Sequence, residues 1–313
     1  MNTSRIQQGM TNITTRLLSS GVVLMLFSAT CFVASIILIK IAGDDFGISF
    51  WLITLCRFAV GLVLVQTLFH GKQKVAWRRL FTDPWLLTRG LLGGSIIPLY
   101  NLCILELGAG RSTILSSSYP IFAALLAPLL VPENLKLRHI VMGLIALGGI
   151  FLMTGPESFG DGLKGYDALA VFIAIVSGLI VVIIRKLHAT DNTATILAAQ
   201  CVFGFIICVP GSLIDASMPS LYGWFFLVGA ALLVAMGQLT MTQGFKYISV
   251  SRGSSLHLLT PVLVTGASIV LLGEFFTLLD IIGGLLIVFS CLFIVNDRWV
   301  VPLKSGPKKS NKC

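Results

Sequence analysis

The sequence predicts an all-α polytopic membrane protein with ten transmembrane helices, arranged as two inverted five-helix repeats. Hydrophobic residues make up 56% of its 313 residues and charged residues only 11%, whereas soluble domains carry about 25% charged residues. Apolar runs of about 20 residues, the length that crosses a bilayer, recur along the whole chain. A repeated stretch then divides these runs into two sets.

The repeated stretch occurs at residues 111–133 and again at 252–274. Four residue pairs coincide without a gap: Arg111 with Arg252, Leu115 with Leu256, Pro120 with Pro261, and Glu133 with Glu274. Each copy is long and apolar enough to cross a bilayer. A doubled unit within a membrane is typical of transporters whose binding site lies between the two halves.

Ten segments qualify as spans, with approximate bounds 19–40, 48–69, 85–106, 112–131, 138–155, 166–185, 193–213, 221–243, 252–272 and 277–296. The predicted domains are a cytoplasmic N-terminal segment (1–18), a first five-helix repeat (19–155), a second, inverted repeat (166–296) and a basic cytoplasmic tail (297–313). Each half holds an odd number of spans, so the second copy is expected upside down relative to the first.

Basic residues gather on one side of the alternating spans. With the N-terminus inside, all of the 22 Lys and Arg residues fall on the inner side except Lys40, Arg57, Arg111 and Lys164; Arg89 is counted at the inner end of the third span. This bias follows the positive-inside rule and predicts that both termini are cytoplasmic, in a bacterial inner membrane. It also accounts for the net charge of +9 without a nucleic-acid partner.

Arg57 lies in the second span, and a block of a small polar or aromatic residue, proline, an apolar run and glutamate occurs in each half. The block runs from Tyr119-Pro120 to Pro132-Glu133 and from Thr260-Pro261 to Gly273-Glu274, with Gly143 and Gly284 in the spans that follow. In these features, over about residues 20–296, the chain resembles EamA-type members of the drug/metabolite transporter superfamily. Pro132 stands where that family usually has Gly. The resemblance implies gradient-linked movement or exchange of small organic metabolites.

Three prolines, Pro98, Pro120 and Pro261, lie within predicted spans. A proline removes a backbone hydrogen bond and leaves a carbonyl free, which is tolerated where neighbours or a cavity satisfy it. Because two of them recur in corresponding spans, a bend that lines the substrate path and serves the gate is favoured over a static kink.

Polar side chains within the spans are the candidates for a substrate cavity. They are Tyr100, Asn101, Ser117, Tyr119, Gln238, Thr242, Gln243, His257 and Thr260. Amide and hydroxyl groups can hold a zwitterion or a heteroaromatic ring without the full cost of burying a charge. Hydrogen bonds between helices are the alternative role for the same groups.

Four ionisable residues could carry coupling or structural charge. Arg57 near the centre of its span is either a functional charge or part of a structural ion pair or carbonyl clamp. His257 could titrate near neutral pH and link transport to protons, or pack as a neutral histidine. Glu133 and Glu274 end their spans, where capping or a loop salt bridge is favoured over proton carriage.

No enzyme motif, phosphate-binding loop or metal-ligand spacing occurs in the sequence, so no catalytic residue, metal or cofactor is predicted. The expected partners are a small-molecule substrate and membrane lipid, with monomer and homodimer both open. The expected function is secondary active transport of a small polar or amphiphilic metabolite, an amino acid or derivative first. A nucleoside-like compound such as S-adenosylmethionine is an alternative, because residues 89–93 and 110–113 are similar to members that handle it. A non-transporting membrane scaffold or sensor is the rival from another class.

Overall fold

A computed structural model describes residues 3–69, 74–130, 165–214, 218–248, 250–257 and 259–295, together with 141–142, 144–146, 148–149 and 152; side chains are described from residue 21 onward, except at 251, 252, 255, 291, 294 and 295. The regular structure in this part of the chain is entirely helical. Its elements are α1 (Thr3–Asp44), α2 (Phe50–Leu68), α3 (Trp77–Thr82), α4 (Pro84–Leu107), α5 (Ala109–Ser116), α6 (Tyr119–Leu130), α9 (Gly165–Leu187), α10 (Thr193–Ile214), α11 (Leu221–Tyr247), α12 (Val250–Leu256), α13 (Leu259–Leu272) and α14 (Leu278–Val295).

Seven helical segments within the described residues are long and apolar enough to cross a membrane. They correspond to the predicted spans one to four and six to eight. Two shorter apolar helices, Leu259–Leu272 and Leu278–Ser290, lie where the ninth and tenth spans are predicted. The predicted fifth span, 138–155, lies mostly outside the described residues, so the ten-helix inverted repeat stays a prediction.

Polar residues mark where several spans begin. Asp83 accepts hydrogen bonds from the backbone N–H groups of Trp85 and Leu86, and Pro84 opens α4. Ser220 caps the first turn of α11 in the same way. These side chains satisfy backbone donors that a helix start leaves without partners, and proline suits the first helical position because its missing N–H is not needed there.

Two of the predicted spans are interrupted rather than bent. The helix of the fourth span stops at Ser116 and resumes at Tyr119, and that of the ninth stops at Leu256 and resumes at Leu259. Pro120 and Pro261 lie in the first turn of the resuming helices, α6 and α13, where proline is tolerated. Pro98, in contrast, lies inside the continuous helix α4.

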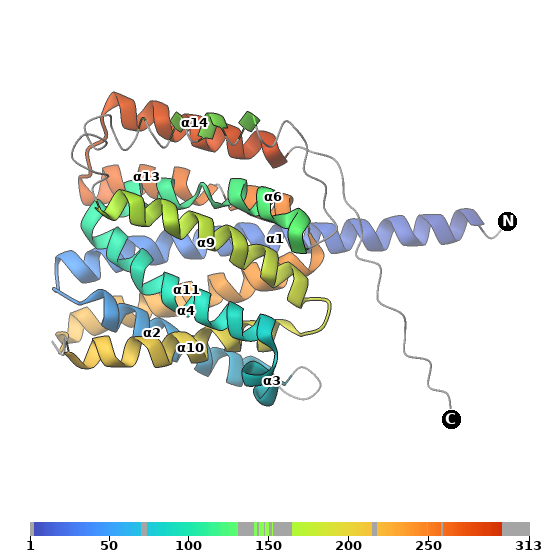
Figure 1. Cartoon of the computed structure of the whole chain (residues 1–313), viewed down its shortest axis with the longest axis horizontal. Coiled ribbons are helices and arrows are strands. Elements are labelled where there is room, and N and C mark those ends of the chain that lie inside the picture. The colour runs from blue at the N-terminus through green and yellow to red at the C-terminus, as the bar shows by residue number, and fades with distance from the viewer. Residues whose placement is uncertain are drawn as a thin grey trace.

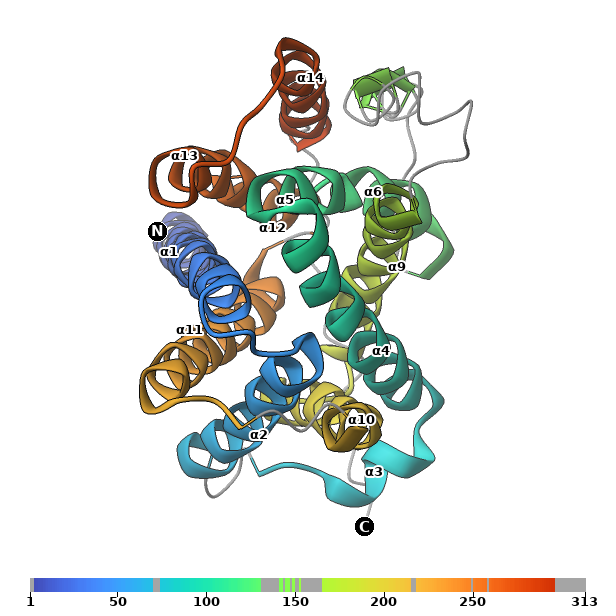
Figure 2. The same cartoon turned by 90° about the vertical axis from the view of Figure 1, so that its left-hand side faces the viewer.

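The helices run side by side in one bundle (Figure 1), and the view along their axes shows them arranged around a centre, with α14 at the edge (Figure 2). Neighbours approach closely at glycines: a Cβ on Gly94 of α4 would lie 2.7 Å from the backbone N of Gly204 in α10. Such small-residue contacts are typical of helix packing in membranes. Large apolar side chains such as Leu285 and Phe289 of α14 are exposed, as expected for a surface that faces lipid.

Candidate functional site

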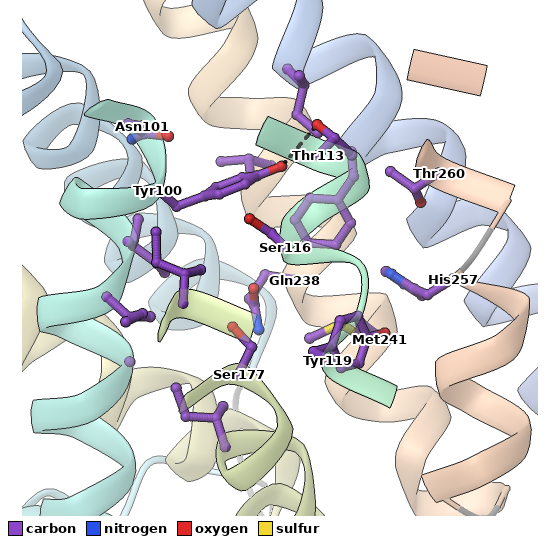
Figure 3. Close-up of a pocket in the computed structure, with 18 of the residues that line it drawn as sticks. Tyr100, Asn101, Thr113, Ser116, Tyr119, Ser177, Gln238, Met241, His257 and Thr260 are labelled. Carbon is purple, nitrogen blue, oxygen red and sulfur yellow. Dashed lines mark hydrogen bonds between the residues drawn. The ribbon is translucent and has the colours of Figure 1, made fainter. Parts of the chain in front are cut away.

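A cavity of about 180 Å³ lies between the helices at the level of the two interruptions. Space of this size holds on the order of ten water molecules, which is the scale of a small metabolite. Its polar lining comes from both halves of the chain: Ser35, Arg57, Arg89, Tyr100, Asn101, Thr113, Ser116, Ser117, Tyr119, Ser177, Gln200, Gln238, His257 and Thr260. Figure 3 shows ten of the lining residues labelled, with Tyr100 across the cavity from His257 and Thr260.

Seven of the nine predicted cavity residues line this space: Tyr100, Asn101, Ser117, Tyr119, Gln238, His257 and Thr260. Thr242 and Gln243 are not among the lining residues. The hydroxyl of Thr242 donates to the carbonyl of Gln238 at 2.7 Å. Oε1 of Gln243 accepts a hydrogen bond from Thr193 at 2.5 Å. Both side chains are therefore used in packing α11 rather than in the cavity.

The two interruptions bring polar groups to the cavity wall. Ser116, Ser117 and Tyr119 surround the break between α5 and α6, while His257 and Thr260 surround the break between α12 and α13. Both prolines are buried beside them. The cavity therefore lies against both interrupted spans, as the proline pattern favours.

His257 is held by a short chain of hydrogen bonds. Its Nε2 lies 3.0 Å from Oγ of Ser28, and that hydroxyl donates to the carbonyl of Gly237 at 2.7 Å. Since a serine hydroxyl has a single hydrogen, Nε2 of His257 must be the donor to Ser28. The ring also meets Phe32 edge-on, with centroids 5.5 Å apart. These contacts fix the tautomer and orientation of the imidazole.

Tyr100 and Asn101 link α4 to its neighbours. The hydroxyl of Tyr100 lies 3.1 Å from that of Thr113, the contact dashed in Figure 3. The amide nitrogen of Asn101 donates to Thr54 at 2.8 Å, whereas its Oδ1 is buried without a partner in the described part of the protein.

Two arginines line the cavity, and their described hydrogen bonds go to amide oxygens. Arg57 of α2 donates to Oε1 of Gln238 at 3.2 Å, and Arg89 of α4 donates to Oε1 of Gln200. Arg57 is 8% exposed and Arg89 is 0% exposed. Arg89 was predicted at the inner end of the third span, and the structure shows that its side chain turns into the bundle, where Gly93, one turn later, leaves room for it.

Sequence reasoning also missed Gln200 as a lining residue. It lies eight residues into an apolar segment, and a polar side chain at that depth was the available signal.

Glu274 belongs to a cluster at one end of the bundle, formed with Arg111, Asp167 and Asp280 and called here the Glu274 cluster. Its carboxylate accepts hydrogen bonds from the backbone N–H groups of Ala109 at 2.6 Å and Gly110 at 2.9 Å, at the start of α5. Arg111 binds both oxygens of Asp167, at 3.0 and 3.1 Å, and lies 3.6 Å from Asp280. Glu274 thus caps α5. Glu133 lies outside the described residues.

A second group at the other end of the bundle, called here the His188 cluster, consists of Arg185, His188 and the end of α11. Nε2 of His188 donates to the carbonyl of Thr242 at 2.7 Å, and Arg185 donates to the carbonyl of Phe245 at 2.8 Å. Burial, and secondarily the nearby charges of Arg185 and Lys246, lower the pKa of His188 to about 4, against the opposing effect of its hydrogen bond. His188 is therefore neutral at pH 7.

Among the described residues, no group of His, Cys, Asp or Glu side chains could hold a metal ion. The polar groups of the cavity are donors and acceptors suited to binding an organic molecule.

Two parts of the sequence, residues 19–155 and 164–296, match the sequence profile of the EamA-like transporter family. The chain belongs to this family. The resemblance drawn from Arg57 and the repeated proline–glutamate block is thereby confirmed, and the protein is an integral membrane transporter of the drug/metabolite transporter superfamily.

Relatives of this EamA-like transporter match most of its length. It is 25% identical over 283 residues to the "Pseudopaline exporter CntI" of two Pseudomonas aeruginosa strains, covering 90% of this chain and 98% of the relative. An "Uncharacterized transporter" of Archaeoglobus fulgidus is 24% identical over 77% of this chain. A solved structure with 17% identity superposes with a TM-score of 0.64 and covers 89% of this chain and 96% of the other, a likeness that shows the fold alone.

Proposed function

We propose that the protein is a secondary active transporter that moves a small polar or amphiphilic metabolite by alternating access, with amino acids and their derivatives as the first class to test. The observation that carries this proposal is the polar cavity between the two interrupted helices. Interrupted helices whose ends surround a central site are a recurring design of secondary transporters.

The two end clusters support alternating access. The Glu274 cluster joins α13 and α14 to α5 and α9 at one end, and the His188 cluster joins the α9–α10 region to the end of α11 at the other. To open the cavity to one side, the helices joined by the cluster on that side must separate, while the cluster at the other end stays intact. Each cluster consists of a few charge-assisted or capping hydrogen bonds, so its separation is a local event.

We place the protein in a bacterial inner membrane with both termini in the cytoplasm, on the basis of the distribution of Lys and Arg. The Glu274 cluster then faces outward and the His188 cluster faces the cytoplasm. The names of the two Pseudomonas relatives support export as the direction to test first.

The test is metabolite counterflow in proteoliposomes loaded with mixed amino acids and nucleosides, read by mass spectrometry with and without an imposed pH gradient. We expect selective exchange of one compound class, reduced by Gln238→Ala. Gln243→Ala is the matched control, since Gln243 lies on the same helix but not in the cavity lining. Exchange of nucleosides alone would support the nucleoside-like alternative, and no exchange by folded protein would favour the scaffold.

A further inference from the structure

We propose that Arg57 and Arg89 form an anion site in the cavity. This site selects cargo that carries two carboxylate groups, one for each guanidinium ion. This inference rests on the proposed transport function and names the substrate class of the same cavity. Its basis is that the protein supplies both buried cations with amide partners and, among the described lining residues, with no carboxylate.

The charge balance of the cavity is the first argument. Arginine stays protonated under all ordinary conditions, so the lining carries two positive charges from Arg57 and Arg89. The described lining residues include no Asp or Glu. The carboxylates found near arginine elsewhere in the described structure are at the bundle ends, as in the pair of Arg111 with Asp167. A buried charge without a counter-ion is costly, and a bound anion removes that cost.

The hydrogen bonds of Arg89 are the second argument. A guanidinium has five N–H donors arranged in a planar fork that matches a carboxylate. Nη2 of Arg89 donates to Gln200, but its Nε and Nη1 are buried without a hydrogen-bond partner among the described residues. A purely structural arginine would have these donors satisfied, as buried polar groups generally are. The unsatisfied donors indicate that a ligand completes the set.

The arrangement of the two pairs is the third argument. Arg57 with Gln238 joins α2 to α11, and Arg89 with Gln200 joins α4 to α10. Arg57, Gln200 and Gln238 also line one small adjoining void together, which places the two pairs beside each other. Gly93 keeps space open at the second pair, because a Cβ there would collide with Nη1 of Arg89. Two guanidinium groups with fixed amide neighbours thus lie on one wall of the cavity.

Besides the two arginines, the lining offers further polar groups, including His257, Thr260 and the hydroxyl of Tyr100. Apolar side chains such as Phe32 and Ile97 fill the rest of the lining. The cavity therefore suits a compact molecule with carboxylates at one end and a less charged, partly apolar body. A cation without an acidic group would meet two like charges and is expected to be rejected.

The experiment compares matched acid and amide compounds in counterflow. Proteoliposomes are loaded with glutamate and glutamine, aspartate and asparagine, and succinate and succinamide, and exchange is read by mass spectrometry. Wild-type protein is expected to exchange the acidic member of a pair about tenfold or more faster than its amide. Arg89→Gln and Arg57→Gln should each bring that ratio toward one, and Arg89→Lys should retain part of it. Arg78→Gln, at an exposed position outside the cavity, should leave the ratio unchanged.

A binding measurement covers variants that fail to fold. Acidic compounds should raise the Tm of detergent-solubilised wild-type protein, while their amides at equal ionic strength should not. Exchange or stabilisation by neutral compounds alone would overturn the anion site and leave the transport function standing. The anion site would also be overturned if folded Arg57→Gln and Arg89→Gln proteins kept the wild-type ratio of acid to amide exchange. No exchange of any compound, with no ligand-induced shift in Tm, would instead refute the transport function itself.

Discussion

Glu274 is predicted to hold one end of the transporter closed. Its two carboxylate oxygens accept hydrogen bonds at 2.6 and 2.9 Å from Ala109 and Gly110, and the helix N-terminus adds a favourable dipole. A hydrogen bond to a charged group contributes about 1.5–3 kcal/mol, but water replaces part of this when the end opens. We therefore expect Glu274→Ala to remove about 2 kcal/mol from the closed state, which shifts the ratio of open to closed by about 30-fold.

The assay measures access to the cavity. A cysteine replaces Ser177, a lining residue, in protein whose seven native cysteines have been replaced, and a membrane-impermeant thiol reagent is added to vesicles of either orientation. Glu274→Ala should raise the labelling rate about 30-fold from the side of the Glu274 cluster, and Glu274→Gln should raise it less. Glu106→Ala, at an exposed acidic position near the same end, is the control. Equal labelling rates in folded Glu274→Ala and wild-type protein would refute the reasoning.

Two further predictions concern stability. Gly178→Ala places a Cβ 2.7 Å from the backbone N of Ala123, so it should destabilise the protein by about 1–3 kcal/mol. Gly266→Ala is the control, because a Cβ there has nothing within 4 Å and should not destabilise the protein. Equal Tm values for the two variants would contradict the predicted clash at Gly178. For His188, whose pKa is lowered from 6.5 to about 4 in the folded state, the unfolded chain binds the proton first, so stability should fall as the pH drops from about 6.5 to about 4. Thermal unfolding at pH 7 and pH 5 should show a smaller pH effect for His188→Gln than for wild-type protein, and an identical effect would exclude His188 as its source.

Much of the fold follows from the sequence because burial in a bilayer imposes strong local rules. A span needs a long apolar run with internally satisfied hydrogen bonds, so the bounds of α2 and α10 could be predicted closely from hydropathy alone. The paired prolines likewise marked the right places. They could not show whether the helix bends or stops, because that depends on which groups accept or donate in place of the lost hydrogen bonds.

The candidate site could be predicted only in part, because hydropathy gives the depth of a residue but not the direction it faces. Gln238 and Thr242 lie four residues apart on α11, yet only Gln238 reaches the cavity. Arg89 lies close to the start of its helix, where a charge normally marks the membrane face, and its inward direction depends on the space at Gly93. Its partner Gln200 comes from a segment far along the chain, and no local pattern in the sequence pairs the two.

The helices α5 and α12 connect the cavity to the two end clusters. The first turn of α5 is held by Glu274, and its last residue, Ser116, lines the cavity. Eight helical residues span about 12 Å. At the other end, α12 follows the segment held by Arg185 and leads to His257 at the cavity wall. A ligand that shifts the wall at Ser116 is expected to strain the Glu274 cluster through α5, and one that shifts the wall at His257 is expected to strain the His188 cluster through α12 and the end of α11. We therefore infer that cavity occupancy and end opening are energetically coupled.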